Sequence, residues 1–325
     1  MLLTKKKDYK LYVEVKKEEK EEEKKLTEIT FSNLELLHEI VMSSLPQQRL
    51  PRETGARFRS ELAYRIFLLE TALDVRGDVL VKSRRISHLD SSEKSLIHYY
   101  LGMAFTKMIA RRMFQVDCLL PVSVIPAKEG GYLKAPGSNR NDLIGGAFFG
   151  EEYSVWSVKG RSQNSLTAIR IGCREVSDFV RVCDSPVSLK AVCMTYYDNG
   201  YLNAVVQIPG QSSLEKSRQV SVDFSREDYL RAYYHCVAGL FGTKGEKKMY
   251  RRDRKFFEDG ICLGIPLYPT EETGASRTLH VGMSEELLRN VRQDSASFTS
   301  CLQSLCWQET LDHGKYMGGD FIYLY

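Results

Sequence analysis

The chain has 325 residues, of which 43% are hydrophobic and 27% charged, so it can form one large domain or two ordinary ones. Its 46 Lys and Arg nearly balance its 42 Asp and Glu, so any basic surface must be local. We expect no membrane partner, because no apolar run reaches about 18 residues, and no secretory signal. The eight cysteines lack a CxxC pair, which favours reduced thiols and a cytoplasmic protein.

The first third of the chain contains a charge block followed by helical patterns. Lys and Glu alternate at short spacing through residues 5–30, so residues 1–30 are interpreted as a charged N-terminal arm, either a solvated helix or a flexible segment. Apolar residues then recur at helical spacing in two stretches before residue 75. Residues 31–89 are therefore predicted to be a helical N-terminal region.

A long helix is predicted to begin after Asp90. Asp90 followed by Glu93 matches a capping box, and an apolar stripe then runs from Leu96 to Ile109. The carboxyl group of Glu93 therefore has two interpretations. It caps the helix, or it is a ligand of a metal ion bound nearby.

Strands and one helix follow up to residue 210. The predicted strands are residues 118–125, the segment beginning at Asp142, and residues 153–159, 189–197 and 202–208, with a helix over 165–182. Asp198-Asn199-Gly200 is a strong hairpin turn between the last two strands. Residues 90–210 are thus predicted to form one α/β core.

The remaining residues, 211–325, are predicted to be a C-terminal α/β extension. Helices are expected near 226–241 and 284–305, and strands over 261–268 and 321–325. A basic cluster includes Lys247, Lys248, Arg251 and Arg252, interleaved with aromatic residues. Such a segment can follow a nucleic-acid backbone, but a solvated loop explains the same charges.

The strand over 153–159 places Ser157 and Lys159 on one face, because strand side chains alternate. Magnesium takes oxygen ligands, commonly one or two carboxylates with waters and phosphate oxygens. A metal-dependent nuclease needs such acids to hold the ion, and a lysine can orient or polarise the attacking water. Asp142 and Lys159 supply one acid and the lysine, whereas Ser157 stands where the second acid is expected.

This region resembles the PD-(D/E)XK, or restriction-endonuclease-like, nuclease superfamily. The resemblance covers residues 90–210 and rests on Leu101-Gly102-Met103-Ala104, Asn141-Asp142-Leu143-Ile144-Gly145 and Trp156-Ser157-Val158-Lys159-Gly160-Arg161. It implies a mixed sheet flanked by helices, with Asp142 as a metal-binding residue and Lys159 as the catalytic lysine. Ser157 and Asn141 depart from the family pattern, so the motif is a degenerate Asp…Ser-x-Lys.

Three interpretations of Ser157 remain open. The acid has migrated to the following helix, as in some restriction endonucleases of this superfamily, with Glu175 the best candidate for a catalytic and metal-binding carboxylate. Alternatively, the site is inactive and the fold only binds nucleic acid or a partner protein. In the third interpretation, Asp142 and Lys159 are ordinary structural residues. Arg161, after the strand, is a candidate phosphate contact.

The expected fold is a restriction-endonuclease-like mixed sheet flanked by helices, with a helical N-terminal part and an α/β C-terminal extension. The expected function is Mg2+-dependent hydrolysis of phosphodiesters in nucleic acid, with DNA favoured over RNA, in phage defence or restriction. The alternative is a catalytically inactive nuclease-fold subunit that binds nucleic acid or a protein partner. A homo-oligomer is compatible with both.

Overall fold

The computed structural model describes residues 8–17, 24–43, 55–134, 142–210, 219–242, 250–267, 277–293, 298–305, 310–312, 315–318 and 320–325. Its largest element is a curled, mixed nine-stranded sheet with the order β2-β1-β4-β11-β10-β7-β6-β5, in which β3 also pairs with β4. These strands are β1 (Asp8–Lys17), β2 (Lys24–Ser32), β3 (Leu73–Arg76), β4 (Val79–Lys82), β5 (Cys118–Pro121), β6 (Asp142–Gly146), β7 (Tyr153–Gly160), β10 (Leu189–Asp198) and β11 (Tyr201–Ile208). Together with the helices they make a mixed α/β fold.

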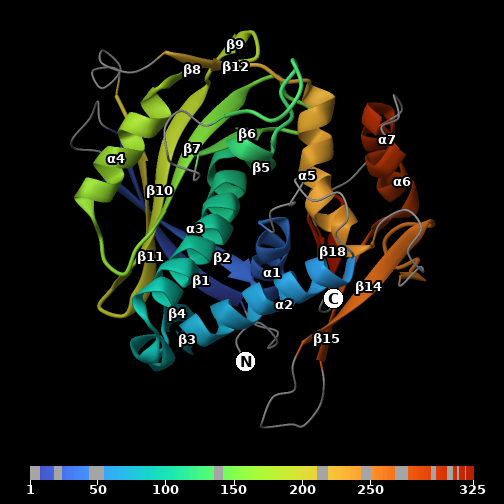
Figure 1. Ribbon diagram of the computed structural model, residues 1–325. Coiled ribbons are helices and arrows are strands. Elements are labelled where there is room, and N and C mark those ends of the chain that lie inside the picture. Colours follow the sequence, from blue (N-terminus) through green and yellow to red (C-terminus); the bar gives the residue numbers. More distant parts are fainter. Residues whose placement is uncertain are drawn as a thin grey trace.

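Two helices cover opposite faces of this sheet at β7. Helix α3 (Ser91–Phe114) crosses it where Gly102 meets Val158 and Gly160, and helix α4 (Leu166–Ser177) packs on the other face, where Gly172 meets Val192. Figure 1 shows α3 in front of the strands and α4 at their left edge. These two sides of the sheet are called the α3 face and the α4 face.

The N-terminal prediction was wrong for the described residues. Instead of a solvated helix or arm, β1 and β2 form an antiparallel hairpin, and β1 also pairs in parallel with β11. Within β1, Tyr9, Leu11 and Val13 are buried on the α3 face, while Lys10, Tyr12 and Glu14 alternate with them on the other side. The charges therefore mark one face of a strand with a period of two residues, which is the pattern of a half-buried strand.

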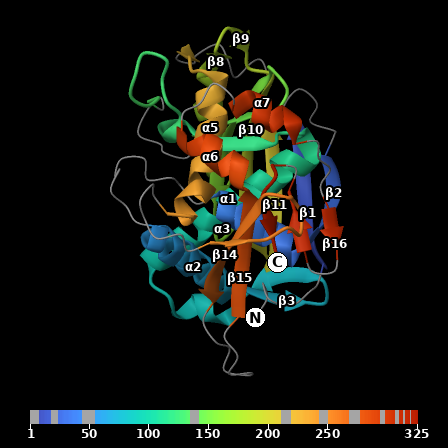
Figure 2. The same ribbon diagram turned by 90° about the vertical axis from the view of Figure 1, so that its right-hand side faces the viewer.

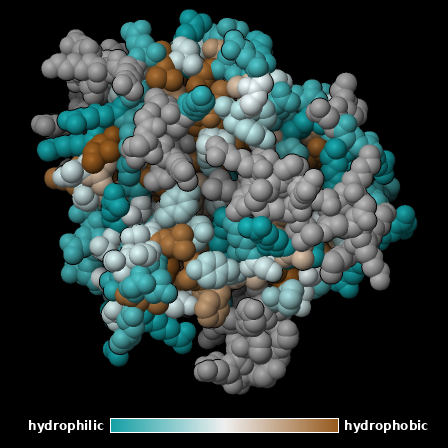
Figure 3. All heavy atoms as spheres, viewed as in Figure 1, coloured by the Kyte–Doolittle hydropathy of each residue, from teal (hydrophilic) through white to brown (hydrophobic). Residues whose placement is uncertain are grey.

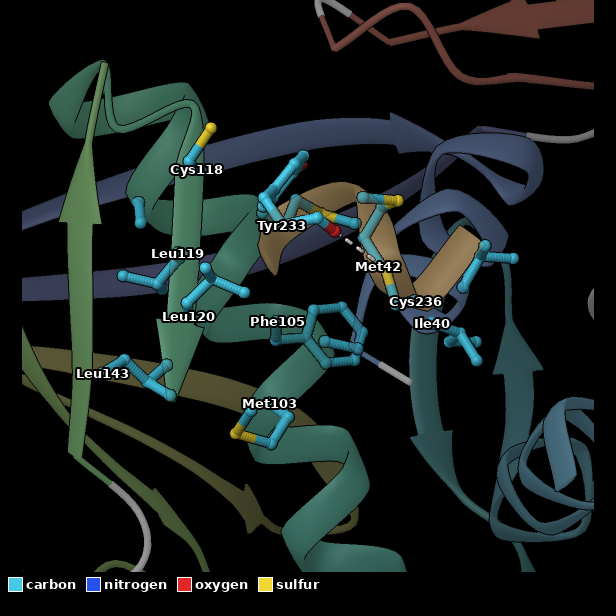
Figure 4. Close-up of a cluster of buried hydrophobic side chains, with 14 of the residues drawn as sticks. Ile40, Met42, Met103, Phe105, Cys118, Leu119, Leu120, Leu143, Tyr233 and Cys236 are labelled. Atoms are coloured by element: carbon cyan, nitrogen blue, oxygen red, sulfur yellow. Dashed lines mark hydrogen bonds between the residues drawn. The ribbon is translucent and has the colours of Figure 1, made fainter. Parts of the chain in front are cut away.

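The predicted helical region is only partly helical. Helices α1 (Asn33–Met42) and α2 (Gly55–Ala72) form as expected, but β3 and β4 add two short strands to the main sheet before a 3-10 turn, η1 (Arg84–His88). All residues of α1 are buried. Figure 4 shows Ile40 and Met42 of α1 with Met103 and Phe105 of α3 and Tyr233 and Cys236 of a later helix, in a single apolar cluster.

The C-terminal extension carries its own sheet, of order β13-β14-β15-β18-β17-β16. Its strands are β13 (Arg251–Arg252), β14 (Gly260–Leu267), β15 (Arg277–Ser284), β16 (Thr310–Asp312), β17 (Lys315–Met317) and β18 (Tyr323–Leu324), and its helices are α5 (Arg226–Leu240), α6 (Glu285–Gln293) and α7 (Phe298–Ser304). Figure 2 shows β14 and β15 in front of the main sheet. A third small sheet, β12-β8-β9, combines β8 (Phe179–Val182), β9 (Ser185–Pro186) and β12 (Val220–Val222).

Several local predictions are confirmed. Asp90 accepts hydrogen bonds from the backbone of Ser92 and Glu93, and Glu93 reaches back to the amide of Asp90, which completes the capping box. Asn199 and Gly200 both have positive φ, as a tight hairpin turn between β10 and β11 requires.

The face seen in Figure 3 is largely hydrophilic, with small separate hydrophobic patches. Within the described ranges, no helix is long and apolar enough to cross a membrane.

Candidate functional site

Strand β7 supplies two polar side chains to the α4 face. Ser157 pairs with Val192 of β10 and Lys159 pairs with Met194, so both lie inside the parallel part of the sheet. The side chain of Ser157 is fully buried and that of Lys159 is 7% exposed. The alternation expected from the sequence is confirmed, because the neighbouring Trp156 points to the opposite face of the strand and packs against Phe114 of α3.

Helix α4 brings Glu175 over these residues. The helix begins at Ser165, whose side chain accepts a hydrogen bond from the amide of Ala168, and it runs back along β7. Gly172 lies against the sheet, where an added Cβ would come within 2.6 Å of Val192 and 3.2 Å of Lys159 Cε. The missing side chain therefore lets α4 approach closely enough for Glu175 to reach β7.

The three side chains meet at one carboxylate oxygen. Ser157 Oγ donates to Glu175 Oε2 over 2.7 Å, and Lys159 Nζ donates to the same oxygen over 2.6 Å. Both members of the ion pair are nearly buried, at 7% and 10% exposure. Low exposure strengthens the attraction between the charges and also makes each of them costly without its partner.

Asp142 occupies the sheet position directly opposite Ser157, since β6 and β7 are antiparallel and pair these two residues. Opposite residues of an antiparallel pair share a face, with Cβ atoms about 5 Å apart. The side chain of Asp142 is outside the described part of the structure. The backbone pairing thus places position 142 beside Ser157. The hydroxyl of Ser157 in turn donates to the carboxylate of Glu175 on α4.

The donor chemistry at this point suits Mg2+, which prefers carboxylate oxygens. Glu175 provides one carboxylate, and Asp142 is the second acid at the same level of the sheet. Among the side chains that the structure describes, no group of three or more His, Cys, Asp and Glu residues could hold a metal ion. A metal held here would therefore use one or both of these acids, with water and substrate oxygens completing its shell.

Glu93 does not join this group. Its Oε2 accepts a hydrogen bond from the Asp90 amide over 3.0 Å at the exposed start of α3. That helix packs on the other face of the sheet, since Gly102 is against Val158 and Gly160. The structure thus brings Glu175, Ser157 and Lys159 together and leaves Glu93 at a helix cap.

Arg161 follows β7 directly and is exposed, and its backbone amide donates to Thr195 O over 2.9 Å. The preceding Gly160 has a packing role, because an added Cβ would lie 1.8 Å from the carbonyl oxygen of His98 in α3. The close approach of α3 to β7 therefore explains a glycine at position 160. Sequence reasoning did not single out Gly160 or Gly172 as positioning residues, although a glycine inside a strand or helix pattern signals close approach.

Arg251 and Arg252 of the basic cluster form β13, which pairs with β14, and Figure 1 shows β14 on the right of the molecule and α4 on the left. Arg251 and Arg252 are exposed in β13. Arg251 donates to Tyr325 Oη over 3.2 Å, so it is held against the sheet. Lys247 and Lys248 are outside the described residues.

A second polar cluster, unforeseen in the sequence, joins α1 to the C-terminal segment. His38 Nε2 lies 2.9 Å from Asp320 Oδ1, and the hydroxyl of Tyr233 donates to Asp320 Oδ2 over 2.8 Å. Burial by itself would lower the pKa of His38, but the carboxylates of Asp320 and Glu39 raise it to about 9. This imidazolium therefore stabilises the attachment of the C-terminal segment.

Comparison of the chain with protein-family models, with curated proteins and with solved structures finds no match.

Proposed function

We propose that this chain is a nuclease-fold protein of the PD-(D/E)XK type that hydrolyses phosphodiesters in nucleic acid, with DNA as the favoured substrate. In this proposal, the acid missing at Ser157 is supplied from α4 by Glu175. The observation that carries the proposal is the shared contact of the Glu175 carboxylate with Ser157 and Lys159. A restriction-endonuclease-like sheet and a role in phage defence are parts of the same proposal and rest on the sequence resemblance.

Each residue then has a defined role. Glu175 and Asp142 would hold Mg2+, which when bound supplies a Lewis acid for the phosphate and lowers the pKa of a water. Lys159 holds a proton-donating ammonium beside this position, where it orients the attacking water and offsets negative charge that develops on the phosphate. Ser157 fixes the rotamer of Glu175 through its hydroxyl. Arg161, exposed directly after β7, would neutralise a flanking phosphate.

The proposal is tested by incubating the purified chain with single- and double-stranded DNA and RNA in the presence of Mg2+ or Mn2+. The variant Lys159→Met removes the ammonium and keeps the length of the stem. Lys190→Met is the matched control, because Lys190 is on the same sheet, bonds to Ser177 O at the end of α4, and lies outside the Glu175 contact. We expect cleavage by the wild type and by Lys190→Met, and a loss of at least 100-fold in Lys159→Met.

Two results would count against the proposed nuclease activity. If the wild type leaves every substrate intact, the chain is not a nuclease under these conditions. If Lys159→Met cleaves as fast as the wild type, the activity belongs to another site, and the roles given to Glu175 and Asp142 fail as well.

A second candidate is a catalytically inactive nuclease-fold subunit that binds nucleic acid or a protein partner. One observation favours it: the Lys159–Glu175 pair is almost closed to solvent, at 7% and 10% exposure, as in a structural ion pair that fixes a helix to a sheet. Exposed Arg251 and Arg252, with Lys247 and Lys248 before them, would then supply the nucleic-acid contact. Binding of DNA without cleavage, weakened by Arg252→Ala and unchanged by Lys159→Met, is the result expected for this candidate.

A further inference from the structure

Strand β2 forms one edge of the main sheet, and within the described ranges it pairs with β1 alone. The side chain of Leu26, near its start, is 68% exposed, the largest exposed fraction among the large apolar side chains that the structure describes. A long edge strand with an exposed apolar residue is a template for pairing with another chain. The question is which chain it fits.

The backbone groups that point outward from β2 can be assigned. The amide of Lys10 donates to Asp78 O, on the side of β1 away from β2. Since the direction of these groups alternates along a strand, even-numbered residues of β1 point away from β2 and odd-numbered ones point toward it. Even residues pair with even residues in this ladder, so Leu26, Glu28 and Thr30 direct their N–H and C=O groups outward.

We propose that β2 pairs with β2 of a second copy of this chain, antiparallel and centred on Leu26, so that the main sheet continues through a homodimer. A twofold axis perpendicular to the sheet at Leu26 pairs even-numbered residues of one copy with even-numbered residues of the other. These are the residues whose N–H and C=O groups point outward from β2. Leu26 then lies opposite Leu26 of the second copy, and Glu28 lies opposite Lys24 on both sides of the axis. Apolar contact at the centre and opposite charges beside it both stabilise this register.

Neighbouring registers are less favourable. Centring the pair on Glu28 places two glutamates directly opposite each other, which is destabilising. Centring it on Thr27 places Leu26 opposite Glu28 and leaves Leu26 without an apolar partner. Glu28 already bonds to Lys10 within its own chain, over 3.1 Å, so the carboxylate is held in place on the exposed side of the strand. Charge and apolar matching together therefore select the Leu26 register.

The test uses the full chain carrying either Leu26→Cys or Thr30→Cys under mild oxidation. Hydrogen-bonded opposite residues have Cα atoms about 5.5 Å apart, within the range that a disulfide spans. In the proposed register, the two Thr30 positions are separated by eight residues of strand, roughly 27 Å. We expect the Leu26→Cys chains to form a covalent dimer and the Thr30→Cys chains to stay single.

Light scattering of the unmodified chain completes the test. We expect twice the mass of one chain, with Leu26→Lys raising the dimer dissociation constant at least 30-fold and Thr30→Lys changing it less than threefold. Both sites are exposed, so neither change interferes with folding, which thermal unfolding verifies. A monomeric wild type at 100 µM, a dimer unaffected by Leu26→Lys, or equal cross-linking at positions 26 and 30 would each overturn the proposal.

Discussion

The ammonium of Lys159 on β7 and the carboxylate of Glu175 on α4 are 2.6 Å apart. Sixteen positions separate the two residues in the chain, and the return of α4 along the sheet brings them together. The hydroxyl of Ser157 donates to the same oxygen. Ser157, Lys159 and a glutamate on the next helix thus form one hydrogen-bonded unit.

The first prediction concerns the energy of this pair. Glu175→Gln removes the carboxylate that pairs with the nearly buried Lys159 ammonium, and we expect it to lower the free energy of unfolding by about 3 kcal/mol. Lys159→Met should cost a similar amount. The double variant removes both charges and should lie within about 1 kcal/mol of the wild type. Urea unfolding of the four proteins measures this cycle, and additive single effects would show that the pair is not coupled.

A second prediction concerns the close approach of α4. Gly172→Ala adds a Cβ that would meet Val192 at 2.6 Å and Lys159 Cε at 3.2 Å. Alanine favours a helix over glycine by about 1 kcal/mol, but we expect overpacking to win and stability to fall by about 1–3 kcal/mol. The change at the neighbouring exposed Ile171, Ile171→Ala, should alter stability by less than about 0.5 kcal/mol. A stabilised Gly172→Ala variant would contradict the packing described for α4.

The third prediction separates the two roles considered for Glu93. Glu93→Gln keeps a residue that can complete the capping box, so we expect stability and any Mg2+-dependent cleavage to stay near wild type. Asp90→Ala removes the cap itself and should cost about 1 kcal/mol. Thermal unfolding and cleavage rates check both. A cleavage rate that falls more than tenfold in Glu93→Gln at unchanged stability would restore Glu93 as a metal ligand.

The fourth prediction is a pH dependence carried by His38. Its pKa is raised to about 9 in the folded chain from an ordinary value of 6.5, through Asp320 and Glu39 against the opposing effect of burial. The stabilisation is therefore complete below pH 6.5 and is lost as the pH rises through 9, a change on the order of 3 kcal/mol. Urea unfolding between pH 6 and pH 9.5 should show this decline in the wild type. His38→Gln should lack it, and equal slopes in both proteins would refute the assignment.

The sequence predicts the local elements that carry the candidate site better than the fold around them. The alternation of Ser157 and Lys159 and the helix that carries Glu175 follow from local patterns, and both are confirmed. Whether Glu175 faces β7 depends on the rotation of α4, which is fixed by the packing of Gly172 against Val192. That contact joins a helix and a strand 20 positions apart, and the pattern of either element alone does not contain it.

The N-terminal strands show the opposite case, in which local information was present but its period was misread. The charges in residues 5–30, Lys10 and Glu14 among them, predicted a solvated helix or a flexible segment, whereas Leu11 and Val13, which alternate with these two charges, are fully buried. Pairing of β1 with β11, almost 200 residues later, depends on long-range register that no window of sequence reveals. The His38–Asp320 contact is missed for the same reason.

The central claim is that Glu175 supplies the acid that Ser157 lacks. It is tested most directly by Mn2+ binding, followed by electron paramagnetic resonance, in the Lys159→Met variant and in the Lys159→Met/Glu175→Gln double variant. Because Lys159→Met removes one charge of this nearly buried pair, urea unfolding first verifies that both variants are folded under the conditions of the binding measurement. The account predicts that Lys159→Met binds Mn2+ and that the double variant binds it at least tenfold more weakly. Equal affinity of the two variants, or no binding by Lys159→Met, would contradict it.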